Sequence, residues 1–383
     1  MSLWQYADLL KRINAPRYKG IKDLVVDNGT LICDFSDLSL WELENGTKAA
    51  ATNKRFGTGI KLVNDVGATP LAAEFSPPAQ IKTAESISFW AYIHDIAVVD
   101  NIRLYLETTD YKYKSMGFAH TSLCQGWNHL KFVFDDPNWS VSEGFDMDNF
   151  RRITIAIMGI YPSQPEVDIA NLRLDVTTRP KIIFHFSDGY KSIHSVALPK
   201  LESVGIKGSV GVLSEPILVG NTNYLTIDQL DDLYRAGWCL FNGGHSHEDF
   251  ATLTDQQRAD EIRLCREFLL ANGYTNGLDL FEFPYTPYDI TAYRQALLDS
   301  GIKAAITRPA NTISAPIADL YQLSVIPVYG GNWSSTAKIH VDMGINRGDT
   351  IIINFHDLVG VDITDFHAAV DYIVGLFDVS DIM

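Results

Sequence analysis

Histidine and carboxylate side chains recur at the ends of apolar runs in the second half of the chain. Asp188 follows the run that ends at Phe186, in KIIFHFSDGY, and Ser187 stands between the two. His356 follows another such run, in DTIIINFHDL. Imidazole and carboxylate together suit a divalent metal of the zinc type, which binds nitrogen and oxygen donors. These residues therefore predict a divalent metal site, with zinc as the ion that suits the donors best.

A third polar segment, GGHSHED, contains His245 and His247. The two stand two residues apart, so in an extended backbone both side chains point the same way. Together with Asp188 they predict a site of two histidines and one aspartate that leaves coordination positions open for water. The alternative is a solvated loop, because the segment is very hydrophilic.

Other residues are candidates for the same site. Glu282, in FEFPY, is either a general base supplied by a separate strand or a structural ion pair. Tyr285 lines a cleft for substrate or simply packs. His185 shares a face with Ser187 and is a further candidate for contact with substrate. Trp333 stands in a predicted aromatic loop and is a candidate for a lid over the site.

The elements that must position these residues follow from the pattern after residue 178. Apolar runs typical of strands alternate with segments typical of helices. This order predicts a mostly parallel sheet, open or closed into a (β/α) barrel, with its chemistry at the carboxyl ends of the strands. Strands are predicted over 182–187, 208–213, 238–242, 278–284, 302–307, 322–328 and 350–355, helices over 191–204, 226–236, 254–272, 289–300 and 363–377, and a late loop over 338–344.

The first half of the chain has a different pattern. Short β-like runs recur between turn signals and helical periodicity is almost absent, which predicts an all-β sandwich of the jelly-roll type. Its tryptophans either stack on sugar rings or fill the sandwich; they are Trp41, Trp90, Trp127 and Trp139. The predicted organisation is a helical segment over 1–22, a sandwich over 23–177 and an α/β barrel over 178–383.

Composition limits the partners. The chain has 383 residues and a formal net charge of −16. The length favours two domains, and the charge argues against nucleic acid and anionic membranes as partners. The N-terminal stretch does not have the pattern of a secretory signal. Three explanations stay open: the chain has been trimmed, the protein is cytoplasmic, or it is an extracellular, cell-surface or virion-associated protein that is exported by another route.

Several motifs, in order and spacing, resemble those of the polysaccharide deacetylase family (carbohydrate esterase family 4, the chitooligosaccharide deacetylase homology domain). They are FSDGY at 186–190, YLTIDQLDDLYRAGW at 224–238, FEFPYTPYD at 281–289 and INFHD at 353–357. The first half resembles the non-catalytic jelly-roll modules of carbohydrate-active enzymes. That similarity is carried by DFSDLSLWE, GWNHLKFVFDD and VDIANLRLD.

The family resemblance implies a distorted (β/α) barrel that holds a divalent metal. Carried over by position, Asp188 is the metal aspartate, His247 the second metal histidine and His356 the general acid; the alternative for His356 is a histidine that caps a strand end. The sequence departs from the family at three positions. Ser187 stands in place of the base aspartate, Gly243 in place of the first metal histidine, and Glu282 in place of the arginine that pairs with the base.

The function implied is metal-dependent hydrolysis of N- or O-acetyl groups on a polysaccharide or oligosaccharide, at an atypical site. The expected metal ligands are Asp188, His245 and His247, the expected catalytic residues are His356, Glu282 and Ser187, and the expected substrate contacts are Tyr285, Trp333 and His185. The competing hypothesis is a glycan-binding pseudoenzyme, such as a virion or cell-surface adhesion component, that has no catalytic activity.

Overall fold

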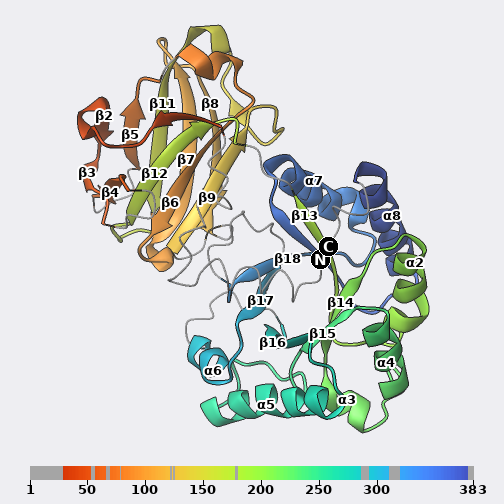
Figure 1. Ribbon diagram of the computed structural model, residues 1–383. Helices are drawn as coiled ribbons and strands as arrows, with labels where there is room; N and C mark the ends of the chain where they lie inside the picture. Colours follow the sequence, from red (N-terminus) through yellow and green to blue (C-terminus); the bar gives the residue numbers. More distant parts are fainter. Residues whose placement is uncertain are drawn as a thin grey trace.

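The computed structural model of the chain describes residues 29–52, 57–65, 70–77, 79–120, 123, 126–176, 180–285, 293–309 and 320–377. Figure 1 shows two bodies in sequence order, a β-sandwich and a (β/α) barrel. The predicted fold class is therefore confirmed for both halves. The predicted helical segment over 1–22 lies outside the described residues.

The sandwich consists of two antiparallel sheets. The first has the strand order β3-β4-β12-β6-β9, with β1 paired to β12, and the second has the order β10-β8-β7-β11-β5-β2. The strands are β1 (Thr30–Cys33), β2 (Trp41–Glu44), β3 (Gly46–Ala50), β4 (Ile60–Asn64), β5 (Leu71–Phe75), β6 (Ser86–Ile93), β7 (Val99–Thr108), β8 (Tyr113–Ala119), β9 (Gly126–Val133), β10 (Ser140–Val141), β11 (Phe150–Gly159) and β12 (Glu166–Leu174). Short 3₁₀ helices lie at Leu38–Leu40, Ala79–Thr83, Ile96–Val98 and Met147–Asn149.

Alternating apolar residues build the core between the two sheets. In β5, for example, Leu71, Ala73 and Phe75 are buried and the residues between them are half-buried, as a strand with one face on a core requires. Trp41 is buried between Phe35 and Phe75, with both ring centroids 5.0 Å away. Trp90 and Trp139 are also buried. Trp41 and Trp139 therefore belong to the sandwich core, the packing alternative, whereas Trp90 is buried against Trp127 and His129 on the other face of β6.

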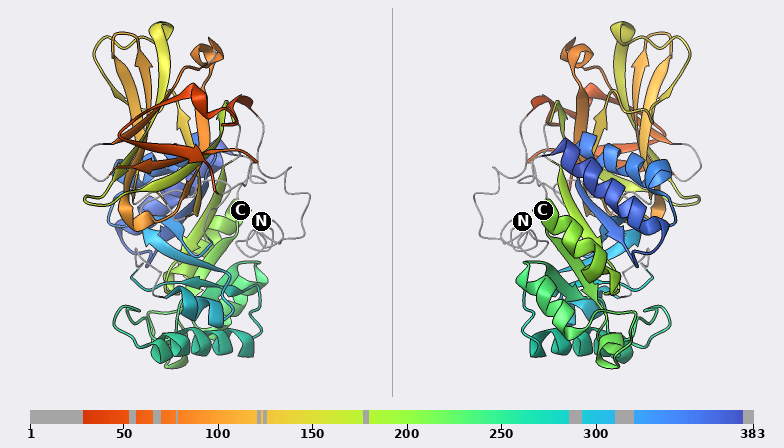
Figure 2. Two further views of the ribbon diagram at one scale, coloured as in Figure 1. Left: turned by 90° about the vertical axis from the view of Figure 1, so that its left-hand side faces the viewer. Right: turned by 90° about the vertical axis from the view of Figure 1, so that its right-hand side faces the viewer.

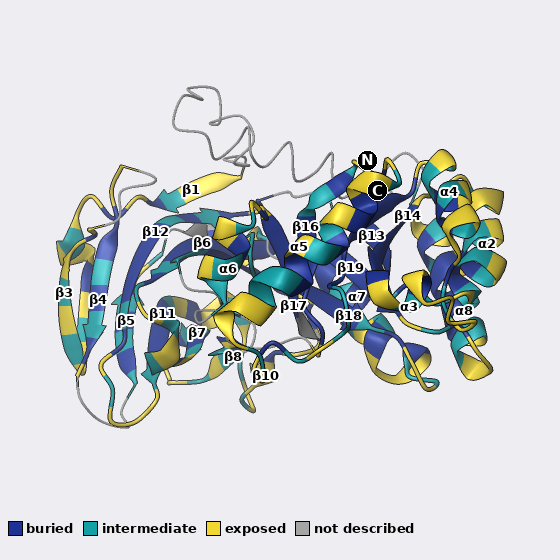
Figure 3. Cartoon of the chain, turned by 90° about the horizontal axis from the view of Figure 1, so that it is seen from below, coloured by how far each residue is buried: buried dark blue, intermediate teal, exposed yellow. Residues whose placement is uncertain are grey.

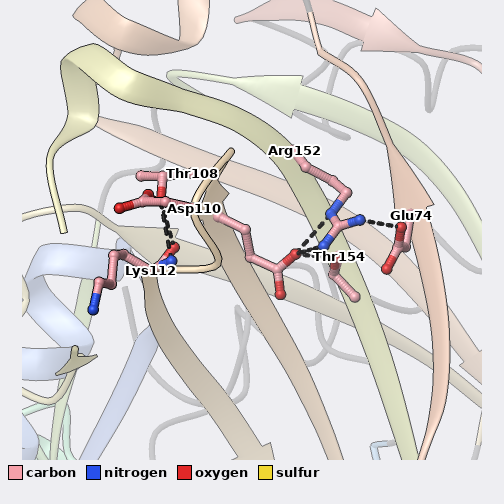
Figure 4. A network of polar contacts seen from close by, with 7 residues as sticks. Glu74, Thr108, Asp110, Lys112, Arg152 and Thr154 are labelled. Atoms are coloured by element: carbon pink, nitrogen blue, oxygen red, sulfur yellow. Dashed lines mark hydrogen bonds and ion pairs between the residues drawn. The ribbon is translucent and has the colours of Figure 1, made fainter.

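Polar side chains link neighbouring strands on the second sheet (Figure 4). Arg152 of β11 donates to Glu107 of β7 at 2.7 Å and to Glu74 of β5 at 2.6 Å. Thr154 donates to the same Glu107 carboxylate at 3.2 Å. The Arg152 guanidinium thus connects three adjacent strands of this sheet.

The barrel is a closed ring of parallel strands. They are β13 (Lys181–Phe186), β14 (Gly208–Val212), β15 (Cys239–Asn242), β16 (Gly277–Glu282), β17 (Ala304–Pro309), β18 (Leu323–Pro327) and β19 (Thr350–Phe355). The first and last strands pair in register from Lys181↔Thr350 to Phe186↔Phe355, which closes the ring. Because the strands are parallel, their carboxyl ends form one rim.

Helices surround the barrel (Figure 2). They are α2 (Leu198–Ser203), α3 (Ser214–Leu218), α4 (Ile227–Arg235), α5 (Asp255–Ala271), α6 (Arg294–Asp299), α7 (Lys338–Arg347) and α8 (Val361–Leu376), with π-helical turns at Ile193–Ala197 and Trp333–Ala337. The helix starts at Thr226 and Thr254 each form a complete capping box, with Gln229 and Gln257 respectively. No helix in the described ranges is long and apolar enough to cross a membrane.

The predicted loop over 338–344 is wrong, because this segment is the first part of α7. The helix buries Val341 and Gly344 and ends at Gly348, whose φ of 73° suits glycine. α7 also contacts β9 of the sandwich. Beside this contact, the Arg347 guanidinium lies 4.9 Å from the Phe118 ring centroid and 3.8 Å from the Asp136 carboxylate. Figure 3 shows that most barrel-strand residues are buried and that exposed residues gather on the outer faces of the helices.

Candidate active site at the carboxyl rim of the barrel

The predicted site residues lie at or near the carboxyl rim. Ser187 and Asp188 directly follow β13, and Glu282 is the last residue of β16. His247 lies in the loop after β15, and His356 directly follows β19. A closed parallel barrel brings these strand ends together although they are far apart in the sequence.

Asp188, His247 and Tyr285 form a strained cluster at this rim. The Asp188 Oδ1 atom lies 3.3 Å from Nε2 of His247, and the Tyr285 ring centroid lies 4.9 Å from that of His247. Their φ values are 70°, 68° and 56°, in the left-handed region that side chains disfavour. In the described part of the barrel these are the non-glycine residues with positive φ. Such strain gathers at functional sites, where the surrounding structure holds it in place.

Within this pair, His247 has an altered pKa. The hydrogen bond and the negative charge of Asp188 raise the pKa of His247 above its ordinary value, against the opposing effect of burial. The Asp188 side chain is 12% exposed and the His247 side chain 31% exposed, so solvent reaches both. Tyr285 is 67% exposed and borders the pair on the solvent side.

The structure does not bring His245 into this cluster. Its Nδ1 atom lies 2.8 Å from the Ser214 hydroxyl, and its backbone N–H donates to Glu261 of α5 at 2.8 Å. The chain bends at residues 245–246, and Gly244 and His247 have φ values of 98° and 68°. The backbone is therefore not extended, so the two histidines do not share a face. The predicted three-residue metal site is wrong: within the described ranges, no three histidine, cysteine or carboxylate side chains are placed to hold a metal ion.

Beneath the strained cluster lies a buried carboxylate, Glu282, which is 6% exposed. Its Oε1 accepts a hydrogen bond of 2.5 Å from the Ser187 hydroxyl and lies 3.2 Å from Nε2 of His185. The Ser187 hydroxyl also lies 2.9 Å from Oδ1 of Asn354 in β19. The His185 ring is stacked 4.9 Å from Phe241. This network crosses the barrel interior from β13 to β16 and β19.

Opposing effects act on the Glu282 carboxyl group. Burial alone raises its pKa, but the nearby His185 ring, the Ser187 hydrogen bond and the charge of His356 together bring the pKa below its ordinary value. Among the groups that lower the Glu282 pKa, His185 has the largest effect, and its buried Nε2 atom lies 3.2 Å from the carboxylate. Glu282 is therefore ionised at neutral pH, as a proton acceptor must be.

Two predicted substrate contacts are wrong. His185 is 0% exposed and faces Glu282 and Ser209 inside the barrel, so a sugar cannot reach it. Trp333 is 5% exposed and begins a π-helical turn, where its ring packs 5.9 Å from Tyr372 of α8. It belongs to the barrel core and offers no exposed face for a lid. His356, in contrast, is exposed at the rim.

Gly211 is a site residue that the sequence prediction missed. A Cβ atom built at this position would lie 1.9 Å from Oε2 of Glu282, so only glycine leaves room for the carboxylate. The available signal was a glycine inside a strand, which often marks a close approach of another group. Ser214 and Glu261, which hold His245, carry no comparable sequence signal.

The donors present fit a divalent metal only in part. Two ligands about 2.1 Å from one ion at a tetrahedral angle are about 3.4 Å apart. The 3.3 Å between Asp188 Oδ1 and His247 Nε2 agrees with that separation. These two residues fit a metal ion, whereas His245 does not.

Comparisons with known proteins give structural similarity without sequence similarity. No family model matches the chain, and no curated protein matches it in sequence. A Streptococcus pyogenes deacetylase in complex with acetate is 17% identical, with a TM-score of 0.34, and the match covers 38% of this chain and 64% of that one, just under two thirds. A family 4 carbohydrate esterase from Streptomyces lividans in complex with acetate is 15% identical, with a TM-score of 0.37 and coverage of 54% and 92%.

A second group of similar structures consists of carbohydrate-binding modules. The family 11 carbohydrate-binding module of a Clostridium thermocellum cellulase is 13% identical, with a TM-score of 0.31, and covers 39% of this chain and 95% of that module. In structure, the chain is thus similar to a deacetylase, to a family 4 carbohydrate esterase and to a carbohydrate-binding module.

Proposed function

We propose that the protein removes N- or O-acetyl groups from a polysaccharide at the carboxyl rim of the barrel. The observation that carries this proposal is the strained cluster of Asp188, His247 and Tyr285, which meet at one solvent-accessible place. Asp188 and His247 would hold a divalent ion there, with zinc as the first choice. When bound, such an ion supplies polarisation of the acetyl carbonyl group and a lowered pKa of bound water.

The remaining roles belong to the side chains of this rim. Tyr285 presents an exposed ring beside His247, where it can border the acetylated sugar. The ionised Glu282 carboxylate accepts the proton of the Ser187 hydroxyl. The Ser187 oxygen takes a proton from water in the same step. His356, exposed at the rim, donates a proton to the departing amine or alkoxide.

A second candidate function is glycan binding without catalysis, in a protein of a virion or cell surface. One observation favours it specifically: His245 is held by Ser214 and Glu261, and Gly243 stands where the family has a metal histidine. The described part of the rim therefore offers two protein ligands, whereas catalytic zinc sites have three. An extracellular, cell-surface or virion-associated location suits either function.

Zinc binding distinguishes the two candidates. In calorimetric titration of metal-free protein with zinc, we expect about one ion per chain, and we expect Asp188→Ala or His247→Ala to weaken binding at least about 100-fold. His245→Ala is the matched control and should leave the affinity unchanged, because that ring faces Ser214. Acetate release from acetylated xylan and chitin oligosaccharides then tests the reaction. Absence of zinc binding to the wild type, with no acetate release, would leave glycan binding as the function.

A further inference from the structure

A hollow of about 310 Å³ lies on the same rim, next to the turn that carries Asp188. It is lined by Lys191, which follows β13, and by residues of α3, the α3–α4 loop and the start of α4. We propose that this hollow is a subsite for one uncharged pyranose ring of the polysaccharide, beside the acetylated sugar. The choice of polymer rests on the proposed function, whereas the site itself rests on the observations below.

Backbone hydrogen bonds fix the position of the hollow relative to the strained cluster. Residues 189–191 and 223–225 run antiparallel: Lys191 N–H donates to the Asn223 carbonyl, and Leu225 N–H donates to the Gly189 carbonyl, both at 2.9 Å. Tyr190 and Tyr224 form the bridge between them, and their rings stack at 5.0 Å with an angle of 22°. A ligand in the hollow is therefore placed relative to Asp188 by backbone hydrogen bonds.

The lining suits a neutral sugar. Ile217 and Leu225 form a buried apolar floor, 8% and 1% exposed. The exposed part of the lining includes the neutral amide and hydroxyl groups of Asn221 and Thr222. A pyranose has an apolar C–H face and a hydroxyl edge, which match such a floor and rim. The volume lies at the small end of the roughly 300–1,000 Å³ of ligand pockets, which fits a single ring.

The charges of the lining and the exposed apolar side chains near it agree with an uncharged sugar as the ligand. The hollow has one cation, Lys191, and one anion, Asp228, so it has no excess of positive charge for a phosphate or a carboxylate. Leu218, Val219 and Ile227, in and beside the lining segments, are 61%, 72% and 42% exposed. Exposed apolar side chains gathered at one place mark binding surfaces. Of these three residues, Ile227 lines the hollow, and Leu218 and Val219 directly follow the lining residue Ile217 in the chain.

The test is to fill the hollow and measure binding of defined oligosaccharides. The probes are tetra-N-acetylchitotetraose and an acetylated xylotetraose, titrated calorimetrically into the full chain. Thr222→Trp places an indole in the hollow without removing a buried contact, and we expect it to weaken binding of the better probe at least tenfold. Thr275→Trp is the matched control, because Thr275 is exposed before β16, at the opposite end of the barrel strands. It should change the affinity less than twofold.

Each result decides the inference separately from the proposed function. Equal affinity of Thr222→Trp and wild type, or no binding of either probe to the wild type at millimolar concentration, overturns the subsite. Hydrolysis of p-nitrophenyl acetate, which is too small to need the hollow, reports on the reaction alone. If Thr222→Trp retains that hydrolysis but has a raised KM for the tetrasaccharide, both proposals stand. If the wild type does not hydrolyse the ester but Thr222→Trp still loses tetrasaccharide binding, the subsite stands and the reaction fails.

Discussion

At the scale of single residues, the Gly211–Glu282 contact makes the sharpest prediction. A methyl group at position 211 would overlap the Glu282 carboxylate at 1.9 Å, and both groups are enclosed by the barrel. We expect Gly211→Ala to lower the free energy of unfolding by about 1–3 kcal/mol, because the carboxylate must leave its place. The measurement is urea unfolding.

A double substitution separates this overlap from the general effect of adding a methyl group. In the double variant Gly211→Ala/Glu282→Ala, the second substitution removes the atoms that the new methyl group would overlap. The loss of unfolding free energy in the double variant should therefore be smaller than the sum of the losses in the two single variants. Gly375→Ala in α8, where no neighbouring atom lies within 4 Å, is the control and should be neutral or slightly stabilising. Strict additivity in the double variant would contradict the assigned contact.

Glu282 also predicts a pH dependence of stability. Its pKa in the folded protein lies below the ordinary value of 4.5, so the folded state releases this proton more readily than the unfolded state. The resulting stabilisation is fully present above about pH 5 and is lost as the pH falls through the lower, folded pKa. In Glu282→Gln we therefore expect a shallower loss of thermal stability between about pH 5 and pH 3. If the wild type and Glu282→Gln lose thermal stability equally between about pH 5 and pH 3, the result would argue against an ionised Glu282.

The position of a residue could be predicted where a strand end determines it, and could not be predicted where the local backbone conformation does. Asp188 and His247 meet because the barrel topology places the loops after β13 and β15 at one rim. His245 was assigned to the same site on the assumption of extended backbone, which the left-handed conformations at Gly244 and His247 break. Tertiary contacts with Ser214 and Glu261 fix that bend, and no short-range pattern encodes them.

At the scale of elements, α5 fixes the loop that carries the strained histidine. One Glu261 oxygen accepts the backbone N–H groups of His245 and Ser246, each at 2.8 Å. We expect Glu261→Ala to cost about 2–4 kcal/mol of unfolding free energy, since two charge-assisted hydrogen bonds are lost. It should also speed amide hydrogen exchange at residues 243–247. Glu267→Ala, on an exposed part of the same helix, is the control and should change neither quantity appreciably.

Element positions were more predictable than element ends. β19 occupies the predicted 350–355, because a short apolar run bounded by polar residues at each end leaves little choice. The capped helices α4 and α5 begin within a residue of their predicted starts, since their capping residues are specific. α7 was missed because Ala337, its N-terminal cap, makes no side-chain hydrogen bond and the preceding π-helical turn begins without a capping signal.

At the scale of the whole molecule, Arg347 joins the barrel to the sandwich. Its side chain is 12% exposed, and the facing Asp136 side chain is 1% exposed. Removing the Arg347 side chain leaves the buried Asp136 carboxylate without this cation. In typical buried ion pairs such a loss lowers the free energy of unfolding by about 3–5 kcal/mol. We expect Arg347→Ala to lower the thermal transition and to separate the unfolding of the two bodies in differential scanning calorimetry. Arg263→Ala, which removes only exposed helix pairs, should shift the transition by less than about 2 °C.

In each of the two bodies the first strand pairs with the last. This pairing has a consequence for synthesis of the chain. The sandwich can pair β1 with β12 once residue 174 has left the ribosome, but the barrel cannot pair β13 with β19 until residue 355 has done so. At about 5–20 residues per second the interval is on the order of ten to forty seconds. During that interval strands β13–β18 have been synthesised but cannot close the barrel, whereas the sandwich can already fold. The sandwich would then act during translation as a folded neighbour of an incomplete barrel.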